Sequence, residues 1–275
     1  MKCLGVDEKG CVNDAAENKQ YCQRHLDEIK QWYDEQGRPK DDRPALEGRV
    51  ALNPTFPISE DSARLRIAYF RQAWRIARDG QSFLKPQERA SIPQPNGEEY
   101  PAQVGYIGPE YCGLVFCLMN HGKAWAEPEL LRLSKMLANV SEDNEIEARK
   151  IFEELMDVTE SFVPRWNNYS RFVAKVLEGT ELTYRNIAYF NTFPFPTRGD
   201  SKGLSEEMLN SAVSHHGKAV MKDLEPRVVI VRYKSVWDAW DNKGILPSAS
   251  CLVSGIVASK AQIENARSLV RAAFA

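Results

Sequence analysis

The sequence predicts an α/β protein of three layers, with a mostly parallel, four-stranded central sheet between helices. From residue 106 onward, short apolar runs alternate with longer segments of helical period. This alternation is typical of parallel strands joined by crossover helices. The runs are almost continuously apolar, as expected for strands that are buried on both faces. The chain has 275 residues, of which 43% are hydrophobic, so it can fill such a core.

The four strands are predicted at residues 111–119, 184–191, 227–233 and 249–255. Helices are expected at residues 128–140, 142–162, 164–179, 205–224, 235–240 and 259–274. Ser205 is a candidate N-cap for one of these helices, and Ser259 with Gln262 forms a capping-box pattern at the start of the last. The charged run from Glu142 to Glu154 is interpreted as a solvated helix face.

Composition and charge narrow the function classes. The formal net charge is -2, so no global basic field indicates a nucleic-acid partner. A nucleic-acid partner would have to be indicated by local clusters of basic residues. No apolar run reaches the length of a membrane span, about 18–20 residues, and the N-terminus lacks the apolar core of a signal peptide. We therefore expect a cytoplasmic protein without a membrane partner, whose six cysteines are thiols or metal ligands. No protein partner is indicated.

The first 33 residues are predicted to form a small zinc module. The ligand candidates are Cys3, Cys11, Cys22 and His25, with the spacing C-x7-C-x10-C-x2-H. Three thiolates and one imidazole suit tetrahedral zinc, and the closing C-x2-H lets both groups reach one ion. This zinc would be structural, because the segment has few apolar residues to fold around. The alternative is a disordered tail with scattered thiols.

Residues 34–105 are predicted to hold an exposed linker, a basic helix and a proline-rich loop. The helix, from Ile58 to Gly80, has a core face at helical spacing, formed by Leu65, Tyr69, Ala73 and Ile76. A second stripe carries Arg64, Arg71, Arg75 and Arg78. Four arginines on one face could contact the phosphates of DNA. The alternative is an ordinary solvated face.

Polar residues stand at the carboxyl ends of the first two predicted strands, where α/β proteins bind ligands. The first strand ends in Asn120-His121-Gly122 and the second in Asn191-Thr192-Phe193-Pro194. The asparagine side chain offers an acceptor and two donors, so it can read a nucleobase edge or hold a water. Asparagine and glycine are also ordinary turn residues, so one asparagine at a strand end is weak evidence for a binding site. Two asparagines at equivalent places in consecutive strands are stronger evidence.

Four stretches resemble, in order and spacing, the motifs of the uracil-DNA glycosylase superfamily. "LVFCLMNHG" is similar to the first motif, closest to the branches in which the strand ends in M-N-P-G. "IAYFNTFPFP" is similar to the second, where an asparagine reads the flipped base. "PRVVIVRYKSVWDAW" and "SCLVSGIVAS" resemble the third strand and the last strand with its loop. The resemblance covers residues 106–275 and implies a glycosylase-like α/β domain.

The resemblance implies a role for each motif residue. Asn120 would position the attacking water, His121 would act as a general acid or stabilise the leaving base, and Asn191 would bind the flipped base. The base would stack on Trp125 or Phe193. Ser254 and Gly255 would lie near a DNA phosphate, and the chemistry would need no metal.

The sequence departs from the superfamily pattern at three positions. Leu118 replaces a glycine, His121 replaces a proline, and Ser254 stands at or near the place of a histidine that stabilises the departing base. These changes favour a substrate other than plain uracil. Glucosylated hydroxymethylcytosine of phage DNA, which superfamily members in bacterial defence remove, is our leading interpretation.

Two other functions fit parts of the sequence. The missing histidine also favours a glycosylase-like protein that binds DNA or a nucleotide without catalysis. A zinc-bearing nuclease is suggested by His215-His216 and Asp200, although no nuclease motif surrounds a strand. Loss of activity with a chelator would distinguish a nuclease from a glycosylase.

Overall fold

The computed structural model describes residues 60–94, 99–119, 128–163, 167–197, 204–254 and 258–274, without the side chains of residues 167–170. All of them belong to one compact unit, Thr55–Ala275. The predicted zinc module with Cys3, Cys11, Cys22 and His25 lies outside the described residues and stays a prediction.

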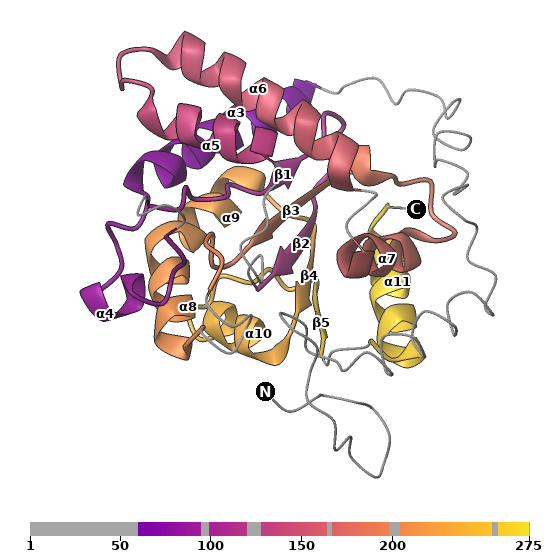
Figure 1. Ribbon diagram of the computed structural model, residues 1–275. Coiled ribbons are helices and arrows are strands. Elements are labelled where there is room, and N and C mark those ends of the chain that lie inside the picture. Colours follow the sequence, from indigo (N-terminus) through magenta and orange to yellow (C-terminus); the bar gives the residue numbers. More distant parts are fainter. Residues whose placement is uncertain are drawn as a thin grey trace, which may run out of the picture. The chain divides into compact units, whose positions relative to one another are not determined.

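The centre of this unit is a five-stranded, mostly parallel sheet (Figure 1). Its strands are β1 (Tyr106–Ile107), β2 (Leu114–Leu118), β3 (Ile187–Asn191), β4 (Val228–Arg232) and β5 (Ser250–Val253), in the order β1-β3-β2-β4-β5. The four predicted strands are confirmed, and they run parallel to one another. The short β1 was not predicted, and it pairs antiparallel with β3 at the edge.

The helices follow the predicted order, except that the short α4 lies in the segment predicted as a proline-rich loop. They are α3 (Glu60–Asp79), α4 (Pro86–Arg89), α5 (Pro128–Asn139), α6 (Glu145–Phe162), α7 (Asn167–Leu177), α8 (Glu206–Ala212), α9 (Lys218–Leu224), α10 (Lys234–Asp241) and α11 (Lys260–Phe274). The single helix predicted at residues 205–224 is interrupted by a π-helical turn, η5 (Val213–Gly217). Ser205 caps α8, and Ser259 and Gln262 form the predicted reciprocal capping pair before α11.

Alternating side chains of the strands reach helices on opposite faces of the sheet. The ring of Phe116 on β2 meets Phe172 of α7 at 5.8 Å, whereas the next residue, Cys117, faces Tyr69 of α3. Phe190, the register partner of Cys117 on β3, contacts Trp240 of α10 at 5.7 Å. Figure 1 shows the same division, with α7 and α11 on one side of the strands and α8 to α10 on the other. Burial on both faces explains why these strands are continuously apolar.

The basic helix α3 is part of this core. Its predicted apolar face is confirmed, because Leu65, Tyr69, Ala73 and Ile76 are all buried. The helix packs against α5, α6 and α9. Its first turn lies at the amino ends of the strands, where Ser62 donates to the carbonyl of Tyr111, just before β2. Its last residue, Asp79, lies near the carboxyl ends of the strands, because its side chain contacts His215 of η5 at 3.0 Å.

Gly108, just after β1, is predicted to tolerate no side chain. A Cβ atom there would lie 2.1 Å from the carbonyl oxygen of Arg185, which belongs to the backbone and cannot yield cheaply. We expect Gly108→Ala to lower the free energy of unfolding by about 1–3 kcal/mol, in urea denaturation. Gly244→Ala is the control for backbone strain without a clash, since its Cβ meets nothing within 4 Å and its φ of +60° is unfavourable for alanine. Equal stability of the wild type and Gly108→Ala would contradict the packing of β1.

Candidate functional site at the carboxyl ends of the strands

The fold brings the carboxyl ends of β2 and β3 together in a defined register. Leu118 pairs with Asn191 at the end of the ladder. The pairing continues past the strands, because the backbone N–H groups of Thr192 and Phe193 donate to the carbonyls of Leu118 and Met119, at 2.8 and 2.9 Å. Asn120 follows Met119 in the sequence. Asn120, His121 and Trp125 themselves lie outside the described residues.

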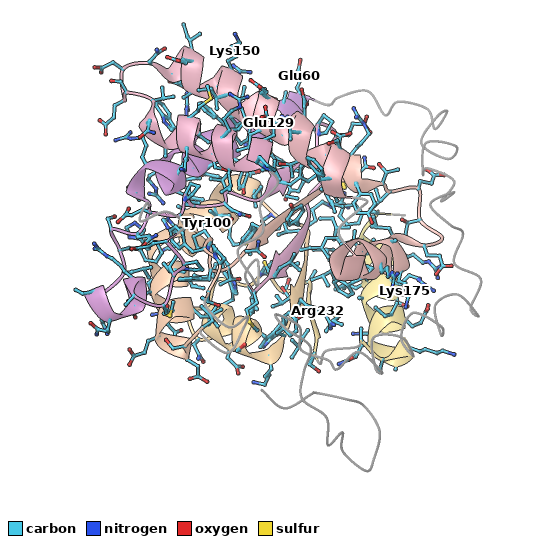
Figure 2. The ribbon with its side chains drawn as sticks, in the orientation of Figure 1. Glu60, Tyr100, Glu129, Lys150, Lys175 and Arg232 are labelled. Atoms are coloured by element: carbon cyan, nitrogen blue, oxygen red, sulfur yellow. The ribbon has the colours of Figure 1, made fainter. Side chains whose placement is uncertain are left out.

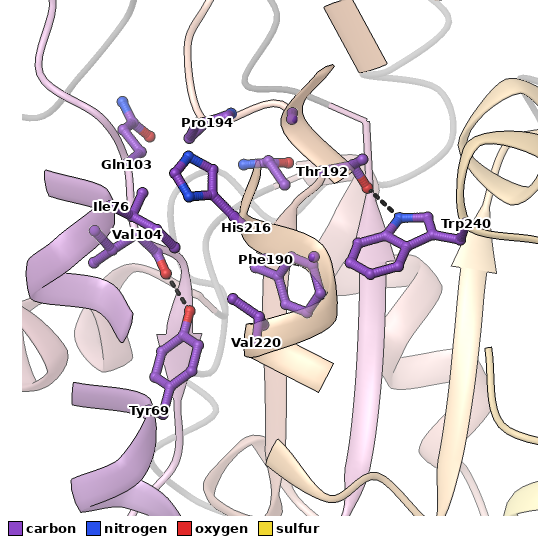
Figure 3. Close-up of a pocket in the computed structure, with 13 residues that line it drawn as sticks. Tyr69, Ile76, Gln103, Val104, Phe190, Thr192, Pro194, His216, Val220 and Trp240 are labelled. Atoms are coloured by element: carbon purple, nitrogen blue, oxygen red, sulfur yellow. Dashed lines mark hydrogen bonds between the residues drawn. The ribbon is translucent and has the colours of Figure 1, made fainter. Parts of the chain in front are cut away.

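A small cavity lies beside the end of β3 (Figure 3). Its volume of about 20 Å³ is enough for one water molecule. Its polar lining comes from three segments of the chain and includes Asn191, Gln103 and His216. Tyr69 and Trp240 contribute aromatic walls. The cavity therefore places amide and imidazole groups around a space where a water could be held.

His216 is the most unusual group in this lining. It is 5% exposed, and neither ring nitrogen has a hydrogen-bond partner within the described part of the chain. Burial, with smaller contributions from His215 and Arg75, lowers its pKa to about 3. The imidazole is therefore neutral at neutral pH and has a lone pair available. The ring of Phe83 packs against it edge-on, at 4.9 Å.

Trp240 fixes the opposite wall of the cavity. Its indole N–H donates to the hydroxyl of Thr192 at 2.9 Å, which ties α10 to the end of β3 (Figure 3). Its ring packs edge-on against Phe190. A Cβ at Gly217 would lie 2.8 Å from the indole ring, so glycine is needed there for η5 to approach.

The ends of β4 and β5 add a buried cation. Arg232, which Figure 2 labels, is only 6% exposed. Its guanidinium lies 5.2 Å from the ring centre of Phe172 and donates to the carbonyl of Val253. The next residue, Tyr233, has a φ of +77°, a conformation that is strained for a residue with a side chain. Such strain concentrates at functional sites. The hydroxyl of Ser254 accepts a hydrogen bond from Gln262 at 2.8 Å, and Gly255 lies outside the described residues.

The four arginines predicted to contact DNA differ in their surroundings. Arg64 pairs with Glu225 at 2.7 Å, Arg71 with Glu145 at 3.3 Å, and Arg78 with Glu142. Arg64 lies at the amino ends of the strands, since Glu225 shortly precedes β4. Arg75 is exposed, makes no ion pair with any described residue, and acts electrostatically on His216. Arg75 is thus the member of the stripe whose charge is not offset by an ion pair with a described carboxylate.

Phe193, predicted as a stacking surface for a base, is fully buried. Its ring packs edge-on against Phe195 at 5.5 Å. A base could stack on Phe193 only after this packing opened. Among the described residues at this end of the sheet, the aromatic rings that line the cavity belong to Tyr69, Phe190 and Trp240.

A larger cavity, of about 1000 Å³, lies at the amino ends of the strands. Its lining includes Arg64, Glu225, Arg227 and Arg271. In open α/β sheets, however, ligands bind at the carboxyl ends of the strands. We therefore place the candidate site at the edge that carries Asn191.

The sequence analysis did not assign Gln103, Trp240, Arg232 or Tyr233 to the site. Gln103 precedes the sheet in a proline-rich stretch, and Trp240 lies within an apolar helical pattern, so nothing local marked either. The His215-His216 pair was noticed, but with Asp200, which lies outside the described residues. The structure instead places Asp79 beside the pair.

Fold and site define an α/β protein whose candidate site lies at the carboxyl ends of parallel strands, around Asn191 and a water-sized cavity. Comparisons with models of protein families, with curated proteins and with solved structures found no match. Within the described ranges, no helix is both long enough and apolar enough to cross a membrane.

Proposed function

We propose that this chain is a monofunctional DNA glycosylase, which hydrolyses the N-glycosidic bond of a flipped, modified base and leaves an abasic site. The observation that carries this proposal is the register of β2 and β3, which sets Asn191 opposite Leu118, two residues before Asn120. The motif resemblance implies that Asn120 positions the attacking water and that Asn191 binds the flipped base. We also propose that the sheet and the helices on its two faces form the three-layer fold of uracil-DNA glycosylases.

The base must leave the duplex, because its glycosidic bond is unreachable within the stack. Asn191 then hydrogen-bonds the base through its side-chain amide. A nucleobase is larger than the water-sized cavity beside Asn191. Binding of the base therefore requires the wall of this cavity to move or the base to lie just outside it.

Departure of the base leaves an oxocarbenium-like sugar, which water attacks at C1′. Asn120 holds this water, and His121 protonates or stabilises the leaving base. None of these steps uses a metal, so the zinc of the N-terminal module is structural in this proposal. The protein acts in the cytoplasm, and its partner is DNA.

The substrate is a modified base rather than plain uracil. Leu118 stands where the superfamily has a glycine, and Ser254 stands at or near the place of its histidine; in this proposal both changes alter the surroundings of the base. We propose glucosylated hydroxymethylcytosine of phage DNA, which makes the protein a defence enzyme.

Arg75 is predicted to contact a DNA phosphate. Replacing it with alanine should weaken DNA binding about equally for all sequences. It should also reduce, by about one, the slope of the logarithm of the binding constant against the logarithm of the salt concentration. Fluorescence anisotropy at several salt concentrations measures both effects. Arg71→Ala is the matched control, because Arg71 lies on the same helix but pairs with Glu145. Equal effects of the two variants would argue against this assignment.

The activity is tested by incubating the full chain, in EDTA, with DNAs carrying uracil, hydroxymethylcytosine or glucosylated hydroxymethylcytosine. Alkaline treatment then cleaves the strand at any abasic site. We expect cleavage in one modified DNA. Cleavage that needs a divalent metal and occurs without alkali would identify a nuclease instead.

A glycosylase-like binding protein is the second candidate function. The small cavity beside Asn191 favours it, because its volume suits one water molecule and is too small for a flipped base. This candidate predicts DNA binding without any abasic product.

A further inference from the structure

Asp79, His215 and His216 form a compact group beside the cavity. Each offers one metal-ligating atom, and these atoms all lie within 4.8 Å of one another. The His215 Nε2 and Asp79 Oδ2 atoms are already 3.0 Å apart. This group joins the end of α3 to η5, two segments that are 136 residues apart in the chain.

The π-helical turn explains how two successive histidines can point to the same place. A π-helix rotates less per residue than an α-helix, so the side chains of His215 and His216 diverge less than usual. Their ring centres are 4.4 Å apart. Phe83 holds both rings, since His215 stacks on it at 5.0 Å and His216 packs edge-on. Single π-turns are frequent at functional sites.

His216 supplies an independent indication of a ligand. Its side chain is more than nine-tenths buried, and both ring nitrogens lack a hydrogen-bond partner among the described residues. An unsatisfied buried polar group is costly, and such a group in a folded protein calls for an unseen water or ion. A neutral imidazole is the form that binds metals.

We propose that Asp79, His215 and His216 bind a divalent transition metal, with zinc as the first choice. Two imidazoles and one carboxylate suit zinc, and three protein ligands leave a position for water. The negative charge of Asp79 offsets part of the charge of the ion, whereas nearby Arg75 opposes it. This site uses none of the residues of the predicted Cys3His module, and no step of the glycosylase proposal depends on it.

A single water in the cavity is the competing explanation for the bare nitrogens of His216. The two explanations differ in their dependence on Asp79 and His215. A water held by His216, Gln103 and Asn191 needs neither residue, whereas a metal needs both. Both side chains are partly exposed, so replacing them should leave the fold intact.

The test counts zinc in the full-length chain and in Asp79→Asn/His215→Gln, after stripping with a chelator and dialysis against zinc. We expect the double variant to hold one ion fewer, whatever the N-terminal module contributes. Its affinity at this site should fall by more than the roughly 10–100-fold that loss of a supporting residue alone causes. Zinc should also raise the Tm of the parent more than that of the variant.

The control is Asp157→Asn, an exposed carboxylate of α6 outside the group. It should hold as much zinc as the parent, and circular dichroism should show that all variants are folded. Equal zinc in the parent and the folded double variant would overturn the proposal and leave a single water as the explanation.

Discussion

Replacing Asn191 with alanine is expected to reduce base release by about 10²–10³-fold, the usual effect of removing one preorganised hydrogen-bonding group from a transition state. The side chain lies at the end of β3 and lines the cavity. Single-turnover release of free base measures the effect. Asn191→Asp is equally informative, because it keeps the shape but removes the amide donors.

The Asn191 variants need a control for general damage. Asn210→Ala removes the same amide from α8 and should retain full activity. DNA binding should persist in all three variants, because phosphate contacts supply most of the affinity. Wild-type rates of base release for Asn191→Ala would remove Asn191 from the proposed mechanism.

Replacing Trp240 with alanine is expected to lower the free energy of unfolding by about 3–5 kcal/mol. The side chain is 1% exposed, packs on Phe190 and bonds to Thr192, so its removal leaves a large void and an unpaired hydroxyl. Urea denaturation measures the loss. Because α10 would no longer be tied to the end of β3, base release should fall as well.

Trp237→Ala on the same helix is the matched control. Trp237 is only partly buried, and its removal should cost clearly less stability. If both tryptophan variants unfold at the same urea concentration, the packing of Trp240 against β3 is not the main support of this edge.

The sequence predicted the sheet well because its strands are buried on both faces. Continuous apolar runs such as that of β2 stand out from any helical pattern. The two-residue strand β1 carries no such pattern, since it is defined only by its antiparallel pairing with β3. The π-turn η5 was also missed, because nothing in the sequence pattern of residues 205–224 marked an interruption of the helix.

The site was less predictable than the fold. Asn191 was identified because it ends a strand, and the rule for α/β sheets points to strand ends. His216 and Gln103 come from other parts of the chain, and only the packing of η5 and of residues 101–104 on β3 brings them to it. The arginines lie on one helix as predicted, but the carboxylates that pair with Arg64 and Arg71 come from distant segments of the chain. The spacing of the arginines could not show these partners.

The most direct test of the central claim is mass spectrometry of free base released, in EDTA, from DNA containing glucosylated hydroxymethylcytosine, with uracil and hydroxymethylcytosine DNAs in parallel. The account predicts free base from one modified DNA with the wild type and almost none with Asn191→Ala. Release of no base from any of these DNAs, by a folded protein that still binds them, would contradict the account and favour a binding protein.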